Sequence, residues 1–292
     1  MIEMKTDTFI EIGSQHKICE DYIISGDNYI ILADGCSSSE HSEMGARFLC
    51  YMTKQFLATT RFPDKLEDRH INGLGTWVIH NAENLVRQLG LKKTCLDATL
   101  IIAYLKDNYV NVIMYGDGYV ILQPERGAVH EIYCIDYKTG SKSMPFYLRY
   151  LIDREGLSLY HAQKVMKTHS IIAIQKNGTV NRPATFETAY DIPTTFSFSI
   201  DGYKSISISS DGLGTFLRPE PGETGNKIMG PEDMVPFIFD FKNSAGVFLK
   251  REMNICKRQL KKIDQKFEHF DDLSIGTFLK EETTDADQSE TE

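Results

Sequence analysis

The sequence predicts an α+β fold in which helices pack on largely antiparallel sheets. Three observations indicate this: paired apolar β-like runs open the chain, two helical stretches follow, and further strand-like runs come after them. With 292 residues and a hydrophobic content of 41%, the chain is large enough to bury a full core. No repeat or linker divides the chain, so we expect one folded body.

The first expected elements are strands at residues 7–13 and 21–33, which are rich in Ile and Tyr and include a turn at 26–28. Residues 43–60 then place apolar side chains at helical spacing, which predicts a helix. A second helix is expected over roughly 65–90, where the apolar residues again form one stripe. The order strand, strand, helix, helix therefore opens the fold.

The rest of the chain reads mainly as strands. Residues 97–123 predict a β-hairpin that turns at 106–108 and a further strand after it. The stretch 134–192 is less regular and contains an expected helical piece at 146–168. The remaining expected elements are strands at 194–200, 204–210 and 272–279 and helices at 231–241 and 246–265.

The formal net charge of −9 lies largely in the last residues of the chain. Residues 281–292 carry six acidic residues and no basic one, so we expect a disordered acidic tail. The body is only mildly acidic, which argues against a nucleic-acid partner bound through a basic face.

The six cysteines are scattered without a CxxC pair, as expected for reduced thiols. Residues 1–13 lack the basic and then apolar pattern of a signal peptide. No apolar run approaches the ~20 residues that a membrane helix needs. We therefore expect a soluble cytoplasmic protein without a membrane partner.

Four acidic clusters stand at the ends or starts of strand-like runs. They are Glu20-Asp21, Asp34-Gly35, Asp211-Gly212 and Asp271-Asp272. Carboxylates gathered at one sheet edge repel each other and are costly to desolvate, so this arrangement indicates bound cations. Oxygen ligands favour hard divalent ions such as Mg²⁺ or Mn²⁺ over zinc. The sequence thus predicts a metal-carboxylate hydrolase.

Six motifs follow one another between residues 8 and 279. They are His16…Glu20-Asp21, DGCSSSEHSEMGAR from Asp34, ATLIIAY from Ala98, Gly116-Asp117-Gly118, SSDGL from Ser209 and DDLS from Asp271. Each alone is weak, since Asp-Gly pairs are common in turns. Together and in this order they resemble the PPM-type (PP2C-like) metal-dependent serine/threonine protein phosphatases, and within them the bacterial PP2C-like subgroup.

The resemblance implies a four-layer α/β/β/α sandwich with two mainly antiparallel sheets flanked by helices. It implies a phosphatase domain over residues 1–280, with a variable flap-like insertion at 134–192 and the tail at 281–292. The implied partners are a phosphorylated protein substrate and a cognate serine/threonine kinase.

The resemblance also implies two divalent cations, Mn²⁺ or Mg²⁺. The implied ligands are Glu20, Asp34, the Gly35 carbonyl, Asp211 and Asp271. Asp34 would bridge the ions, and Asp21 would orient the water bound to them. The implied reaction is direct attack of that bridging water on phosphoserine or phosphothreonine.

Two residues depart from the pattern of better-known members. His16 stands where many have a phosphate-binding Arg, and Cys36 stands where many have a His after the Asp-Gly pair. His16 is either a catalytic donor or acid, since histidine titrates near neutrality, or a solvated histidine. Cys36 is either a small side chain in a turn or an oxidation-sensitive thiol.

These departures leave a second interpretation open, in which the chain is a catalytically weak PP2C-like phospho-sensor or partner-binding module. Two acidic residues also stay open: Asp117 as turn or ligand, and Asp136 as a poorly matching candidate for a third metal. The flap-like insertion offers possible phosphoprotein contacts or simply a polar surface. Its candidates are Tyr147, Arg149, Tyr150, Arg154 and Lys164.

Overall fold

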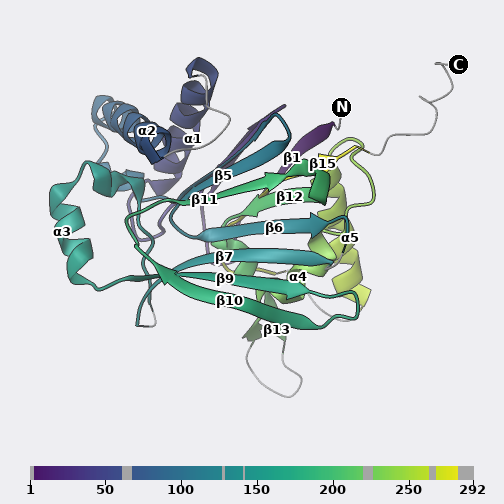
Figure 1. Cartoon of the computed structure of the whole chain (residues 1–292). Helices are drawn as coiled ribbons and strands as arrows, with labels where there is room; N and C mark the ends of the chain where they lie inside the picture. Colours follow the sequence, from purple (N-terminus) through teal and green to yellow (C-terminus); the bar gives the residue numbers. More distant parts are fainter. Residues whose placement is uncertain are drawn as a thin grey trace, which may run out of the picture.

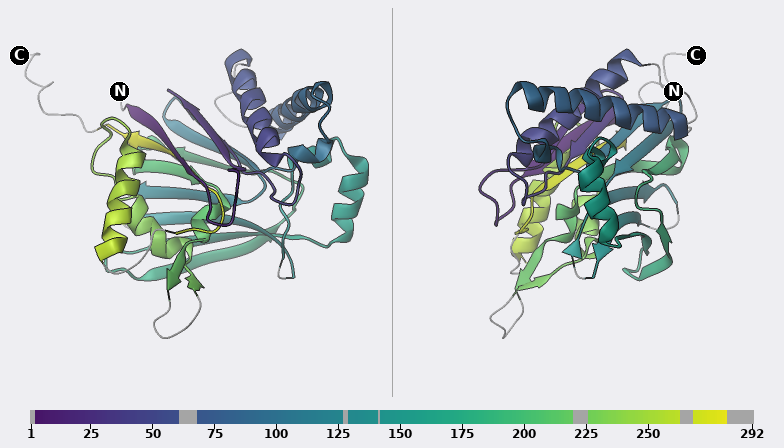
Figure 2. Two further views of the ribbon diagram at one scale, coloured as in Figure 1. Left: turned by 180° about the vertical axis from the view of Figure 1, so that it is seen from behind. Right: turned by 90° about the vertical axis from the view of Figure 1, so that its left-hand side faces the viewer.

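Two antiparallel β-sheets lie face to face, and helices cover the outer face of each (Figures 1 and 2). The computed structural model describes residues 3–60, 68–126, 129–140, 142–219, 226–262 and 268–281. The four-layer α/β/β/α sandwich expected from the sequence is confirmed. The rest of the expected tail, residues 282–292, lies outside the described residues.

The smaller sheet has five strands, with two helices on its outer face. Its order is β11 (Thr194–Ser199), β5 (Tyr109–Tyr115), β4 (Leu100–Lys106), β3 (Tyr29–Ala33) and β2 (Tyr22–Gly26). The covering helices are α1 (Ser42–Thr59) and α2 (Asp68–Gln88). All of its strand pairs are antiparallel, and the expected hairpin turn places Asp107 at positive φ.

The larger sheet has eight strands, and two helices pack on it. Its order is β1 (Met4–Glu11), β15 (Leu273–Lys280), β12 (Tyr203–Ser209), β6 (Gly118–Pro124), β7 (His130–Thr139), β9 (Met166–Ile174) and β10 (Val180–Thr188), with β8 (Lys142–Ser143) paired to β7. The covering helices are α4 (Pro231–Ile238) and α5 (Phe248–Lys262).

Short elements complete the chain. They are η1 (Lys93–Leu96), η2 (Leu148–Leu151), α3 (Arg154–Ala162), η3 (Ile200–Gly202), η4 (Asp211–Gly214), β13 (Leu217–Pro219) and β14 (Asn226–Ile228). Among them, η1, η2 and η4 lie next to strand ends that carry the acidic motifs. These turns therefore matter for the site described below.

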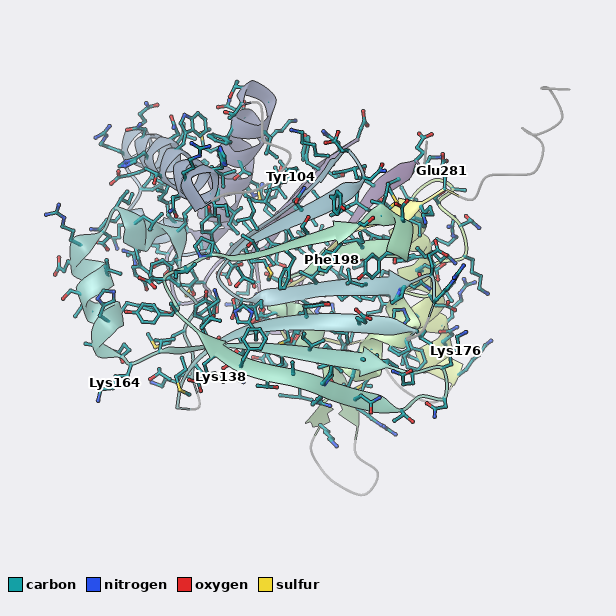
Figure 3. All side chains as sticks on the ribbon, in the orientation of Figure 1. Tyr104, Lys138, Lys164, Lys176, Phe198 and Glu281 are labelled. Carbon is teal, nitrogen blue, oxygen red and sulfur yellow. The ribbon has the colours of Figure 1, made fainter. Side chains whose placement is uncertain are left out.

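Strand β3 shows how one run of residues fills two cores. Successive side chains of a strand point to opposite faces, so Ile30 and Leu32 enter the core between the sheets. Ile31 and Ala33 instead pack against α1 and α2. Figure 3 shows side chains filling the space between the sheets, with Phe198 among them. Full burial of an Ile contributes about 1.5–3 kcal/mol, so this central strand is firmly held.

The helical piece expected at 146–168 is wrong in its second half. The structure has the η2 turn and then α3, which ends at Ala162, and strand β9 begins at Met166. Lys164 has a φ of 52°, a left-handed conformation that cannot continue a helix. The run after it is rich in β-branched residues, which favour a strand.

The expected insertion at 134–192 is largely part of the sheet. Strands β7, β9 and β10 pair in succession at one edge, so regular structure replaces the irregular stretch read from the sequence. Only the piece between β8 and β9 leaves the sheet, and it carries η2 and α3. We call residues 144–165 the η2–α3 segment.

At the C-terminal end of β15, Glu281 still contacts the body. Its backbone N–H donates to the Glu3 carbonyl oxygen over 2.9 Å, and its carboxylate pairs with Lys5. The folded body therefore reaches one residue further than Lys280. Within the described residues, no helix is both long and apolar enough to cross a membrane.

Candidate metal centre

The acidic motifs meet at one end of the sandwich, where strands from both sheets stop or start. Asp21 precedes β2 and Asp34 follows β3, both in the smaller sheet. In the larger sheet, Asp117 precedes β6, Asp211 follows β12 and Asp271 lies two residues before β15. Neighbouring antiparallel strands alternate in direction, so these alternating starts and ends fall on the same edge.

Two glycines allow the acidic turns to come this close. Gly118 has a φ of 132°, and a Cβ there would lie 2.8 Å from the Ser209 carbonyl oxygen. At Gly212, a Cβ would lie only 1.9 Å from the Asp272 carbonyl oxygen. A side chain at either position would push apart the strand ends that carry Asp117, Asp211 and Asp271.

The carboxylates act on one another electrostatically. Burial raises the pKa of Asp34 well above its usual value, and the charges of Asp21, Asp211, Asp271 and Asp117 raise it further. Asp34 is therefore the member of the cluster that all four other carboxylates surround. The structure thus brings together acids that are up to 250 residues apart in the chain: Asp21 and Asp271.

The pKa values of the surrounding acids are shifted in the same direction. Burial raises the pKa of Asp21 to about 7, although the nearby hydroxyls of Ser274 and Ser210 act to lower it. Burial and the charge of Asp271 raise the pKa of Asp211 to about 6. Burial also raises the pKa of Asp271 and of Asp117. Every member of the cluster would keep its charge more readily with a cation nearby.

Several oxygens of the cluster have no hydrogen-bond partner among the described residues. The buried atoms without such a partner include both carboxylate oxygens of Asp21, one carboxylate oxygen of Asp211 and the Ser274 hydroxyl. Buried polar atoms normally have a partner, so these atoms fit an environment completed by a ligand. The donors are all oxygens, which matches a hard divalent cation. The residues present therefore fit the two-cation centre that the sequence motifs imply.

A second group lies beside the cluster in residues 13–20, which we call the His16 loop. The Asp272 carboxylate is 1% exposed and accepts the N–H groups of Gly13 over 2.7 Å and Glu20 over 2.5 Å. His16 Nδ1 lies 3.0 Å from Asp272 Oδ2 and 3.6 Å from Glu20 Oε2, and its Nε2 lies 3.4 Å from Asp271 Oδ1. His16 is therefore held among three acids and is not a freely solvated histidine.

Potential ligand atoms of His16, Glu20 and Asp272 all lie within 4.8 Å of one another, a spacing that a metal ion could use. Asp272 already accepts two backbone N–H groups, which makes it an anchor of the loop. Burial lowers the pKa of His16, but the bond to Asp272 and the charges of Asp272, Asp271 and Glu20 outweigh this and raise it. His16 thus tends to carry a proton here, and a protonated histidine cannot ligate a metal.

Glu20 stands between the two groups. Its Oε1 accepts a hydrogen bond from the Ser42 hydroxyl over 3.1 Å at the start of α1, and burial raises its pKa. Next to it in space, a Cβ on Gly35 would lie 2.8 Å from the Glu20 carbonyl oxygen. The structure therefore places Glu20 and Gly35 side by side, as the sequence motifs predict, beside Asp34.

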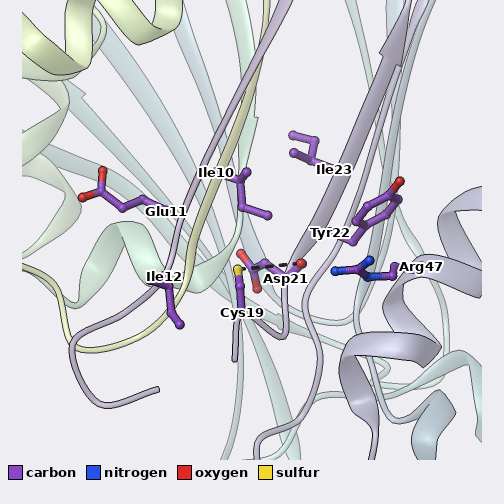
Figure 4. Close-up of a pocket in the computed structure, with 8 residues that line it drawn as sticks. All are labelled: Ile10, Glu11, Ile12, Cys19, Asp21, Tyr22, Ile23 and Arg47. Carbon is purple, nitrogen blue, oxygen red and sulfur yellow. Dashed lines mark hydrogen bonds between the residues drawn. The ribbon is translucent and has the colours of Figure 1, made fainter. Parts of the chain in front are cut away.

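Asp21 also lines a cavity of about 310 Å³, whose lining residues are drawn in Figure 4. The other lining residues come from β1 and the residue after it, from Cys19, from the start of β2 and from α1. The α1 residue is Arg47, whose guanidinium carbon lies 5.2 Å from the centre of the Tyr22 ring.

The sequence reasoning assigned no role to Asp272 and left Asp117 open. The sequence shows Asp271-Asp272 as a pair of acids before a strand, and no local pattern distinguishes the one that anchors the loop. For Asp117, the signal was its position at a strand end, shared with the other acids. The Ser143 hydroxyl donates to Asp117 over 3.2 Å, and Asp136 pairs with Lys138 nearby.

The residues expected to face a phosphoprotein behave differently from one another. Arg149 is 6% exposed and forms ion pairs inside the protein, so the prediction that it lies at the surface is wrong. Arg154 is exposed at the start of α3. Tyr147 and Tyr150 have ring centres 6.0 Å apart, and Tyr147 lies beside Cys36. Cys36 Sγ lies 3.1 Å from the Ser38 hydroxyl, an ordinary contact within a turn.

Comparison with known proteins gives three findings. A family model described as "Protein phosphatase 2C" matches residues 14–141, the part that holds Glu20, Asp34 and Asp117. No curated protein sequence matches the chain. Solved structures match over nearly its whole length, at sequence identities that show the fold alone.

Three of these structures illustrate the likeness. A bacterial serine phosphatase is 12% identical with a TM-score of 0.56 and matches 97% of this chain and 100% of that one. The catalytic domain of the serine/threonine phosphatase PstP, in complex with two manganese ions, is 11% identical with a TM-score of 0.51, over 97% and 100% of the two chains. Stp1 from Staphylococcus aureus is 12% identical with a TM-score of 0.50, over 94% of each chain.

Proposed function

We propose that this chain is a PPM-type (PP2C-like) phosphatase that hydrolyses phosphoserine and phosphothreonine in proteins at the carboxylate cluster around Asp34. The proposal is supported by the match of residues 14–141 to the Protein phosphatase 2C family model and by the fold shared with bacterial serine/threonine phosphatases. The observation that carries the proposal is the environment of Asp34, where four further carboxylates raise its pKa. A fold that had no use for cations would be more stable without this repulsion.

The proposed ligands are the oxygens that the sequence motifs indicate. They are Glu20, Asp34, the Gly35 carbonyl, Asp211 and Asp271. Asp34 bridges two cations in this proposal, because it lies at the centre of the cluster. Two bound cations, Mn²⁺ or Mg²⁺, supply a hydroxide near neutral pH and neutralise charge on the phosphoryl oxygens.

The neighbouring side chains have separate tasks in the proposal. Asp21 orients the attacking water through its two unpartnered oxygens. His16 faces the site from its loop and carries the proton that its three acidic neighbours favour. It is then placed to donate a hydrogen bond to a phosphoryl oxygen or a proton to the leaving hydroxyl.

Replacing Asp34 tests the proposal. Asp34→Asn should lower Mn²⁺-dependent hydrolysis of a phosphothreonine peptide by roughly a thousandfold, about 4 kcal/mol of transition-state stabilisation. It should also abolish the rise in melting temperature that Mn²⁺ gives the wild type. Asp201→Asn is the matched control. Asp201 is exposed and lies before β12, at the opposite end of that strand from Asp211 in the cluster. Undiminished two-ion binding by calorimetry in Asp34→Asn would sink the assignment.

A catalytically weak phospho-sensor or partner-binding module is the alternative. Its support is the pair of replacements, His16 and Cys36, at positions where many family members have Arg and His. A sensor would bind a phosphopeptide with Mn²⁺ present and release no phosphate over many hours. An enzyme would release phosphate in amounts far exceeding the protein. Phosphate release over time therefore separates the two functions.

A further inference from the structure

Arg149 is a buried cation that the proposed chemistry does not use. It lies in η2, off the sheet, and is 6% exposed. Its Nε donates to Asp97 Oδ1 over 2.5 Å, and its Nη1 donates to Asp153. The guanidinium carbon also lies 5.0 Å from the centre of the Tyr150 ring. A buried arginine with two carboxylate partners is a fixed point, because removing one partner leaves an uncompensated buried charge.

Asp97 connects this arginine with residues 34–39, which we call the Asp34 loop. Its second oxygen, Oδ2, accepts a hydrogen bond from the Ser39 hydroxyl over 2.9 Å. Its backbone carbonyl accepts the Cys36 N–H over 2.8 Å. Two residues on, the Thr99 N–H donates to the Asp34 carbonyl oxygen, also over 2.8 Å. Both ends of the Asp34 loop are thus tied to residues 97–99, the link between η1 and β4.

The charges in this network are balanced. Asp97 and Asp153 face Arg149, and Lys93 Nζ donates to Asp153 Oδ1 over 2.6 Å. Burial opposes the charge on Arg149, but its bond to Asp97 outweighs this and raises its pKa. Burial likewise opposes the charge on Asp153, and Lys93 and Arg149 outweigh it and lower its pKa. The pairing therefore favours the charged forms of Arg149 and Asp153.

We propose that Arg149 is a positioning residue for the metal centre, which acts through Asp97 to hold the Asp34 loop in the conformation that binds cations. The inference rests on the proposed function. It deepens that function by making the η2–α3 segment, expected to be a substrate-facing flap, a support of the site. Movement of that segment then reaches Asp34 through two hydrogen-bonded side chains, Arg149 and Asp97.

The geometry of arginine explains why this residue type is needed. One guanidinium presents several donors in a fixed plane, so it holds Asp97 and Asp153 in one relative position. Lysine supplies a single flexible ammonium and cannot fix both. Arg149→Lys should therefore keep the charge and lose most of the positioning.

Amide hydrogen exchange of the metal-free protein tests the inference without any enzymatic readout. In Arg149→Met, exchange at the Cys36 and Ser39 N–H groups should accelerate at least tenfold, and in Arg149→Lys by an intermediate factor. The Glu20 N–H, held by Asp272 on the other side of the site, is the internal reference and should not change. Arg154→Met removes an exposed cation from the same segment and is the matched control.

Calorimetry with Mn²⁺ gives the second readout. Arg149→Met and Asp97→Asn should each weaken the binding of Mn²⁺ about tenfold. Saturating Mn²⁺ should bring kcat back to within twofold of the wild type, because positioning is then restored by the ions. Ser39→Ala, which leaves the Arg149 pairs intact, should give a smaller change in the same direction.

The outcomes are separable. Lower melting temperature with unchanged exchange at Cys36 and unchanged Mn²⁺ affinity would mean that Arg149 only anchors α3, and the inference would be overturned. If Arg149→Met does not fold, Asp97→Asn and Ser39→Ala decide in its place. If the wild type binds no Mn²⁺, the proposed function fails, and the exchange experiment still decides whether Arg149 holds the Asp34 loop.

Discussion

The His16 loop and the Asp34 loop flank the same carboxylate cluster but are held in different ways. The His16 loop is fixed by the Asp272 carboxylate at the start of β15, which accepts two backbone N–H groups. The Asp34 loop is tied to Asp97, which in turn depends on Arg149 from a segment outside both sheets. One side of the site is therefore anchored by Asp272 at the start of a sheet strand. The other side is anchored by two hydrogen-bonded side chains, Asp97 and Arg149.

The difference teaches how the two sides can respond to change. An anchor inside a sheet moves only if the sheet moves, because the strands around it are buried on both faces. An anchor on a short helix off the sheet can shift with that helix. We expect perturbations of residues 144–165 to alter the Asp34 loop and to leave the His16 loop unchanged.

Among the substitutions that test this comparison, the largest loss of stability is expected at Asp272. Asp272→Ala leaves the Gly13 and Glu20 N–H groups without an acceptor and removes the partner of His16. The cost should be roughly 3–5 kcal/mol, the range for breaking a buried charged network. Urea unfolding of the metal-free protein measures it. A cost below 1 kcal/mol would show that water replaces the carboxylate and that Asp272 is no anchor.

The neighbouring acid supplies a control of opposite sign. Burial raises the pKa of Asp271, and its Oδ1 accepts the Asp272 N–H, a hydrogen bond that an asparagine oxygen can still accept. Asp271→Asn should therefore stabilise the metal-free protein slightly, since it removes one repelling charge. The substitutions of the two adjacent acids, Asp272→Ala and Asp271→Asn, should then change stability in opposite directions.

The next largest effect on stability is expected when the pH or the Mn²⁺ concentration is changed. The pKa of Asp21 is about 7 and that of Asp211 about 6 in the folded protein, against about 3.8 when unfolded. Between pH 4 and 7 the folded state holds protons that the unfolded state has released, so the free energy of unfolding falls as pH rises through this window, by several kcal/mol. Mn²⁺ at a hundred times its Kd should add back about 2.7 kcal/mol at pH 7.5.

Melting curves at several pH values, with and without Mn²⁺, check this expectation. Metal-free stability that rises steadily from pH 4.5 to 7.5 would contradict the raised pKa values of the cluster.

Much of this arrangement was predictable from the sequence. Alternating and β-branched runs predicted most strands, and Asp21, Asp34, Asp211 and Asp271 were recognised because each stands at a strand end. The family resemblance supplied the four layers. These features could be predicted because the apolar pattern of a strand and the residues of a motif each lie within a short continuous stretch of the chain.

The relay from Arg149 was not predictable in the same way. Arg149 and Asp97 are 52 residues apart, and neither belongs to a motif. An arginine between two tyrosine-rich stretches looks like a surface residue, and only the packing of η2 against η1 makes it a buried partner. The break in the helical piece at Lys164 was also missed, because a left-handed residue other than glycine leaves little trace in sequence.

The smallest effect is expected in the His16 loop, the loop that Asp272 anchors. His16 lies in the loop anchored by Asp272, so its removal should leave Mn²⁺ affinity within twofold of the wild type. His16→Ala should lower kcat about tenfold near neutral pH, about 1.4 kcal/mol, because it removes the imidazole that lies among the acids Glu20, Asp271 and Asp272. The pKa of His16 is raised by the bond to Asp272 and the surrounding acidic charges, and activity carried by its proton should decline as pH rises through that pKa. His16→Gln separates chemistry from packing, since glutamine can still donate to Asp272 but does not titrate. If His16→Gln restores both the rate and the wild-type pH profile, the histidine only positions its loop, and its catalytic role is wrong.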